Sequence, residues 1–161
     1  MIHVRPAIDL DASSMAALLN KIIEQGGTTA LVTKVTAADL KDRMASDSGR
    51  AAWHVAVNDN EKVMGFQWID AADYLPVEAA EIATFVEVGQ TGLGIGSKLF
   101  DATKKTAKAL GYTWINANIR ADNEGGLIYY QSRGFQDYGR IEDYELADGQ
   151  LVDKILKRYD L

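Results

Sequence analysis

The chain has 161 residues, of which 47% are hydrophobic and 25% are charged, the balance of an ordinary globular protein. Its length suits a single domain of residues 1–161, and no repeat, linker or low-complexity tract divides it. It contains no cysteine, which excludes disulfides, thiolate metal sites and cysteine nucleophiles. Because its start also lacks the pattern of a signal peptide, we expect a cytoplasmic protein.

The formal net charge is −6, from 17 basic and 23 acidic residues. Nucleic-acid binding requires a surface rich in lysine and arginine, so we expect no nucleic-acid partner. No stretch approaches the ~18 consecutive apolar residues of a membrane span, so we expect no membrane association. His3 and His54 have no acidic residue or second histidine at metal-ligand spacing, and we expect no metal.

The first half of the chain predicts two helices and four strands. Apolar residues recur at helical spacing from Met15 to Ile23, and Gly26 ends that helix. Thr36 and Asp39 have the spacing of a capping box and open the second helix. The predicted elements, in chain order, are a strand at 2–5, helices at 11–25 and 36–45, and strands at 53–57, 62–70 and 78–87.

The second half predicts helices at 97–110 and 123–133, which end at Gly111 and Gly134. A strand at 114–118 separates these helices, and a hairpin of strands 135–146 and 150–159 follows. The order βααβββαβαββ predicts an α/β (α+β) fold, with helices packed on a mixed sheet.

Four glycines lie between the strand at 78–87 and the helix that follows: Gly89, Gly92, Gly94 and Gly96. The first N–H groups of a helix have no internal partner, and glycine lets an anion approach them closely. The spacing differs from that of a P-loop and from the dinucleotide pattern GxGxxG. The segment therefore predicts another kind of phosphate site, the alternative being a turn without a ligand.

Residues 91–96 resemble the pyrophosphate loop of the GNAT superfamily, the acyl-CoA-dependent N-acyltransferases, whose pattern is Arg/Gln-x-x-Gly-x-Gly/Ala. Gly94 and Gly96 match this pattern, while Thr91 stands at its Arg/Gln position. A second segment is similar to the family's Asn-x₆-Tyr-x₃-Gly-Phe pattern, through Asn123, Tyr130 and the pair at 134–135. The strand segment 81–86 resembles Glu-x-x-x-Tyr-Val of the phosphinothricin and amino-acid N-acetyltransferase branch.

The resemblance implies a GNAT-type fold, with a mixed, mostly antiparallel central sheet and helices on both faces. It implies acetyl-CoA as cosubstrate, no metal, and direct transfer in a ternary complex to the primary amine of a small molecule such as an amino acid or analogue. The alternatives are a protein or peptide N-acetyltransferase and a non-catalytic acyl-CoA-binding domain. A homodimer is the family's common habit.

The resemblance also assigns two catalytic roles. Glu81 is the candidate general base, and Glu78 and Glu87 remain competitors on the same strand. Tyr130 is the candidate acid for the leaving sulfur, because the family spacing selects it over its neighbour Tyr129.

The expected cofactor-binding residues lie at the end of the strand, along the glycine segment and at the start of a later helix. A main-chain N–H at Phe85 or Val86 is expected to polarise the thioester carbonyl. Asn123 either contacts the cofactor or caps its helix. The full set is Phe85, Val86, Thr91, Gly92, Gly94, Ile95, Gly96, Ser97 and Asn123.

Overall fold

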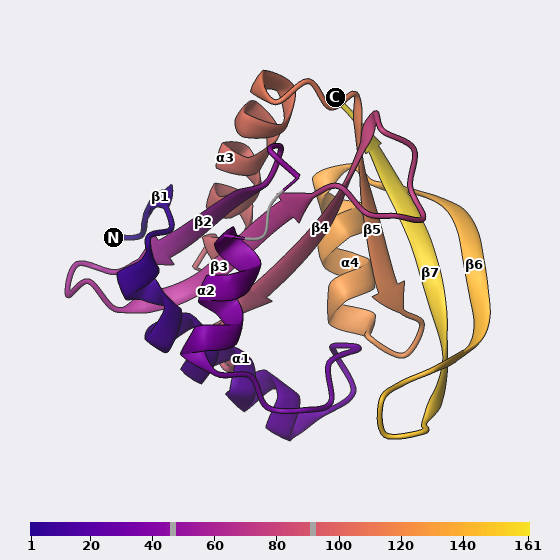
Figure 1. Cartoon of the computed structure of the whole chain (residues 1–161), viewed down its shortest axis with the longest axis horizontal. Coiled ribbons are helices and arrows are strands. Elements are labelled where there is room, and N and C mark those ends of the chain that lie inside the picture. The colour runs from indigo at the N-terminus through magenta and orange to yellow at the C-terminus, as the bar shows by residue number, and fades with distance from the viewer. Residues whose placement is uncertain (46–47, 91–92) are drawn as a thin grey trace.

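The computed structural model describes residues 1–45, 48–90 and 93–161. These residues form a seven-stranded sheet in the order β1-β2-β3-β4-β5-β7-β6, with helices packed against it (Figure 1). The strands are β1 (His3–Pro6), β2 (Ala52–Val57), β3 (Val63–Asp70), β4 (Ala79–Val86), β5 (Trp114–Arg120), β6 (Gln136–Glu145) and β7 (Leu151–Asp160). The helices are α1 (Ala12–Gln25), α2 (Ala37–Ala45), α3 (Ile95–Ala109) and α4 (Glu124–Arg133), with a short 3₁₀ helix at Asp9–Asp11.

The sheet is mixed and mostly antiparallel, as predicted, because only β4 and β5 pair in parallel among its neighbouring described strands. The predicted order of strands and helices is confirmed, with small shifts at the ends. Helix α3 begins at Ile95 rather than at 97, so Gly96 lies inside its first turn despite the low helix propensity of glycine. The 3₁₀ helix was not predicted.

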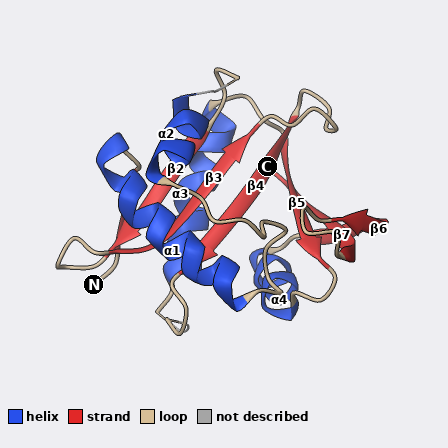
Figure 2. Cartoon of the chain, turned by 60° about the horizontal axis from the view of Figure 1, so that its bottom comes forward, coloured by secondary structure: helices blue, strands red, loops and turns tan. Residues whose placement is uncertain are grey.

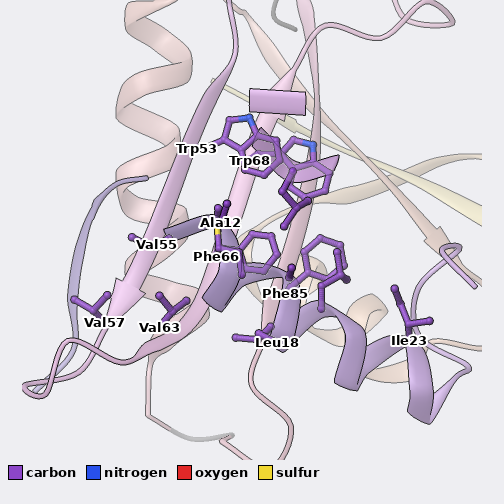
Figure 3. Close-up of a cluster of buried hydrophobic side chains, with 14 residues drawn as sticks. Ala12, Leu18, Ile23, Trp53, Val55, Val57, Val63, Phe66, Trp68 and Phe85 are labelled. Carbon is purple, nitrogen blue, oxygen red and sulfur yellow. The ribbon is translucent and has the colours of Figure 1, made fainter. Parts of the chain in front are cut away.

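The two faces of the sheet carry different helices, as Figure 2 shows. Helices α1 and α2 pack on one face, where buried residues of α1 meet aromatic residues of β2, β3 and β4. In this cluster Trp53 stacks on Trp68 with ring centroids 4.4 Å apart, and Phe66 lies beside them (Figure 3). Helices α3 and α4 cover the other face through two further clusters of buried residues.

Local capping supports the predicted helix boundaries. Thr36 and Asp39 form the expected capping box, since each side chain accepts a hydrogen bond from the other residue's backbone N–H, at 3.0 and 2.8 Å. Gly26 ends α1 with a φ of +69°, a conformation that favours glycine.

Strands β4 and β5 separate part of the way along their length. Their pairing runs from Ala79 opposite Trp114 to Ile82 opposite Ala117 and does not continue beyond that point. Past it the two strands diverge, as Figure 2 shows. The backbone edge of β4 after Ile82 therefore faces an opening in the sheet instead of a neighbouring strand.

Candidate functional site

A cleft of about 780 Å³ lies along this opening. Its walls combine the loop between α1 and α2, the second half of β4, the glycine segment with the start of α3, the end of β5, and α4. Every cofactor-binding residue expected from the sequence lines it, apart from Thr91 and Gly92, which lie outside the described residues. Residues predicted from separate motifs thus lie around one cleft.

The start of α3 forms an anion-binding end of the cleft. Gly94 precedes the helix with a φ of +72°, and its carbonyl accepts the first helical hydrogen bond, from the Lys98 N–H at 3.0 Å. By helix geometry, the N–H groups of the three residues between them have no partner within the helix. The partial positive charge of a helix N-terminus therefore faces the cleft here.

Tyr129 supports this first turn from the side of α4. Its hydroxyl donates to the Gly96 carbonyl at 2.7 Å and accepts from the Gln67 side chain at 3.2 Å. A Cβ atom at Gly96 would lie only 2.5 Å from the Tyr129 ring, so this position requires glycine. Burial raises the pKa of Tyr129 to about 12, which keeps its hydroxyl protonated.

Arg133 lies beside the same turn and was not anticipated from the sequence. Its guanidinium donates to the Ser97 hydroxyl and lines the cleft, and no acidic residue of the described chain pairs with it. A cation next to the positive end of a helix is electrostatically unfavourable unless an anion lies nearby. Its position suits a phosphate group bound at the turn.

Tyr130 lies in the core beneath the cleft, on the α3 and α4 face of the sheet. Only 7% of its surface is exposed, and its hydroxyl is 2.8 Å from the Thr84 hydroxyl. Burial raises the pKa of Tyr130 far above its ordinary value, so the phenol keeps its proton. Both tyrosines line the cleft, and the Tyr130 hydroxyl lies within hydrogen-bonding distance of the β4 hydroxyl of Thr84.

The backbone of β4 presents alternate residues to the opening. The Glu78 carbonyl accepts from Thr113 just before β5, whereas the Glu87 N–H donates to the Met64 carbonyl at the start of β3. Since backbone groups alternate sides along a strand, the even-numbered residues of β4 face β5. Val86 therefore directs its N–H into the opening, while the backbone of Phe85 faces β3.

Glu81 lies on the opposite face of β4 from Tyr130, and the two side chains do not contact each other. One carboxylate oxygen of Glu81 accepts from the Asn116 amide at 2.9 Å, and the other accepts from the Tyr74 hydroxyl. Burial raises the pKa of Glu81 above its ordinary value, although these two hydrogen bonds act in the opposite direction. A raised pKa suits a general base near neutral pH.

Tyr74 covers Glu81 and was missed by sequence reasoning. Its hydroxyl donates to Glu81 and accepts from Asn116 at 2.9 Å and Asn118 at 3.2 Å. Tyr74 comes from the loop between β3 and β4, which carries no motif. The two asparagines alternate with apolar residues along β5, and this pattern was the available signal for a polar group on that face.

The two competing carboxylates lie in different surroundings. Glu87 lines the cleft near the glycine segment, and its side chain pairs with Lys62 at 2.9 Å. Glu78 is exposed, precedes β4 and is not among the residues that line the cleft. Glu81 does not line the cleft itself, but of the three it has the half-buried environment with two hydrogen bonds, next to the end of the β4–β5 pairing.

Asn123 caps α4, because its side chain accepts from the Gly126 N–H at 3.0 Å. Its amide nitrogen donates to the Thr28 carbonyl at 2.8 Å, and Arg120 donates to the Thr29 carbonyl at 3.1 Å. These bonds hold the loop between α1 and α2 against the end of β5. The capping interpretation is confirmed, and a cofactor contact stays a prediction.

The described residues contain no cluster of histidine, cysteine, aspartate or glutamate suited to a metal ion. Their helices include none with the length and apolar character needed to cross a bilayer.

Comparison with known proteins agrees with the geometry of the cleft. Residues 25–135 match the acetyltransferase (GNAT) family. The chain is 26% identical, over 98% of its length and 94% of the relative's, to YwnH of Bacillus subtilis (strain 168), whose name provisionally describes it as a phosphinothricin acetyltransferase.

Two solved structures are similar over nearly the whole chain. An N-acetyltransferase from Staphylococcus aureus Mu50 has a TM-score of 0.87 at 21% identity, covering 99% of this chain and 98% of its own. A phosphinothricin acetyltransferase from Sinorhizobium meliloti, in complex with AcCoA, has a TM-score of 0.86 at 19% identity, covering 99% and 88%. With the family match over most of the chain, the protein belongs to the GNAT family, the acetyl-CoA-dependent N-acetyltransferases.

Proposed function

We propose that this protein transfers the acetyl group of acetyl-CoA to the primary amine of a small molecule, such as an amino acid or analogue. The observation that carries the proposal is the arrangement around the β4 edge. The unpaired strand edge leads into a helix N-terminus, with Glu81 on one face of the strand and Tyr130 on the other.

The residues of the cleft fit acetyl-CoA. The N–H groups of Ile95, Gly96 and Ser97 would bind the pyrophosphate, with the Arg133 guanidinium beside them. The exposed edge of β4 offers backbone hydrogen bonds to the extended pantetheine arm. The N–H of Val86 would bind the thioester oxygen, where negative charge develops during transfer.

Two side chains would move the protons of the reaction. An alkyl amine is mostly protonated at pH 7 and must lose a proton before it attacks. We assign this proton to Glu81, through a water molecule, because Glu81 is not among the residues that line the cleft and its carboxylate is bound to the Tyr74 hydroxyl. Tyr130 would donate its proton to the leaving sulfur, which its protonated phenol allows.

The transfer is direct, because the chain has no cysteine to carry an acetyl group between the two substrates. The small-molecule acceptor is supported by the name of YwnH and by the loop between α1 and α2, which Arg120 and Asn123 hold against the cleft. Acetyl transfer to a free amino acid or analogue is consistent with the name of YwnH and with the position of this loop.

The test is a thiol-release assay with acetyl-CoA and a panel of amines. The panel contains free amino acids, simple alkyl amines, and a peptide with a free N-terminus and an internal lysine. Release of CoA with free amino acids is the expected result. Release with the peptide alone would replace the proposal with a protein acetyltransferase. Binding of acetyl-CoA by calorimetry without release for any amine would replace it with a non-catalytic binding domain.

A further inference from the structure

The cleft carries the opposite charge to the protein as a whole. The protein has a net charge of −6, yet the described residues that line the cleft include four basic side chains and one acidic one. These are Arg43, Arg120, Arg133, Lys154 and Glu87. A basic cleft in an acidic protein attracts anionic ligands.

Two of the four cations are already explained. Arg120 forms a two-pronged ion pair with Asp122, with N–O distances of 3.0 and 2.8 Å. Arg133 lies at the first turn of α3, where the phosphates of the cosubstrate are expected. Arg43 and Lys154 remain.

Lys154 is a buried cation without a counter-ion. Only 8% of its surface is exposed, and its ammonium group forms no hydrogen bond or ion pair with any residue that the structure describes. Its ammonium group lies 3.6 Å from the centre of the Tyr144 ring. Burial lowers the pKa of Lys154, whereas the negative charge of Glu81 raises it. Lysine is rarely buried to this extent without an anionic partner.

Arg43 belongs to the opposite wall of the cleft. It extends from α2 over the Trp68 ring, 4.9 Å from its centre, and it likewise has no ion pair within the described part of the chain. Trp68 pairs with Ala83 of β4, so this cation lies beside the strand that carries Glu81. We call the part of the cleft near Glu81, where the amine would bind, its acceptor half. This acceptor half thus has a cation on each side.

Both cations lie within electrostatic reach of Glu81, near the start of β4. Both act through space on the carboxylate of Glu81 and lower its pKa. From Glu81 to Val86, where the glycine segment approaches, the strand advances about 16 Å at 3.3 Å per residue. Asn118, which also lines the cleft, has a buried side-chain oxygen without a partner in the described chain, and this oxygen suits an N–H donor.

We propose that Lys154 and Arg43 form an anion subsite, and that the acceptor is an amine with a carboxylate or phosphonate group close to its amino group. The proposal rests on the proposed function and names the class of its substrate. In this arrangement the anionic group lies between the two cations, and the amino group lies toward Asn118 and Glu81. The charges of the acceptor half then match those of an amino-acid zwitterion.

The first experiment compares matched acceptors in the thiol-release assay. Each amino acid is paired with the amine that lacks its carboxylate: leucine with 3-methylbutylamine, phenylalanine with 2-phenylethylamine, and alanine with ethylamine. The matching 1-aminoalkylphosphonates show which of the two anions the subsite prefers. We expect kcat/KM to be about tenfold to a hundredfold higher with the anionic member, the scale of a hydrogen bond to a charged group.

The second experiment uses the variants Lys154→Met and Arg43→Gln, with Lys105→Met on the exposed side of α3 as the matched control. The first two should lose about tenfold to a hundredfold in kcat/KM for the anionic acceptor and little for its uncharged partner. KM for acetyl-CoA should not change, and Lys154→Arg should retain the preference. The assay is run above the acid limb of the pH profile of every variant, where Glu81 is ionised, but below the pH at which Lys154 loses its proton. The lost positive charge then acts only on the acceptor.

Calorimetry measures the same effect without turnover. With CoA present, the dissociation constant of the anionic acceptor should be lower for the wild-type protein than for Lys154→Met, by about tenfold or more. Equal kcat/KM for both members of each pair, or equal losses with both in the variants, would overturn the subsite and leave the proposed function standing. Failure to acetylate any amine would overturn the proposed function and the subsite with it.

Discussion

Replacing Tyr74 with phenylalanine removes the hydroxyl that donates to Glu81, and its effect has a defined sign. The hydroxyl donates to a carboxylate oxygen, so it stabilises the ionised form and lowers the pKa of Glu81. Without it, that pKa rises above its already raised value. Since Glu81 must be ionised to accept a proton, the acid limb of kcat/KM should move to higher pH.

The size of this shift follows from the surroundings of the hydroxyl. A hydrogen bond to a charged group contributes about 1.5–3 kcal/mol. Tyr74 is 52% exposed, so water replaces part of the lost bond, and the Asn116 amide still binds the other oxygen of Glu81. We therefore expect a value just below that range, about 1.4 kcal/mol, which corresponds to a shift of one pH unit.

The assay is the pH profile of kcat/KM for Tyr74→Phe against the wild-type protein. The matched control is Tyr112→Phe, which also removes one phenol hydroxyl, here bound to the Arg50 carbonyl away from the cleft. At a pH one unit below the wild-type limb, Tyr74→Phe should be about tenfold slower, whereas at high pH the two should be similar. A limb that stays in place or moves to lower pH refutes the reasoning.

Three further changes test other parts of the structure. Tyr130→Phe should lower kcat by about a hundredfold, the scale of general acid catalysis, with acetyl-CoA affinity within about twofold of wild type; unchanged turnover in the thiol-release assay would remove Tyr130 from catalysis. Gly94→Glu places a side chain and a negative charge where φ is +72°, and calorimetry should detect no acetyl-CoA binding; normal affinity would show that the loop is not the phosphate site. Asp11→Asn breaks the ion pair with Arg5, in which the arginine lowers the pKa of Asp11. Because a lowered carboxylate pKa stabilises the fold above about pH 4, this variant should melt at a lower temperature at pH 7, and the difference should shrink as the pH falls below 4. A difference that does not depend on pH would contradict that account.

The elements that the sequence predicts well are those with local signals. Helix periodicity, the Thr36 capping box and the glycine stop signals depend on residues within a few positions of each other, and all of them agree with the structure. The order of strands and helices also predicts the fold class, because few sheet topologies are compatible with a given order of elements. Glu81 and Tyr130 were selected from motifs, and their roles stay predictions.

The features that the sequence did not predict depend on contacts between distant segments. The Tyr74 hydroxyl meets Asn116 and Asn118 across 42 and 44 positions of the chain. The unpaired charge of Lys154 becomes visible only when the sheet shows which carboxylates lie within reach. No local pattern marks Tyr74 or Lys154, because the same side chains on a solvated surface have no particular role.

The bonds that hold the loop between α1 and α2 have a consequence for how the protein folds. Asn123 and Arg120 bind Thr28 and Thr29 across 95 and 91 positions of the chain. Closing such a long loop costs entropy that nearby contacts cannot recover, so these bonds form late. During synthesis on the ribosome, the loop between α1 and α2 therefore lacks these partners until β5 and the start of α4 have been made. Substrate binding and completion of the fold then depend on the same few hydrogen bonds.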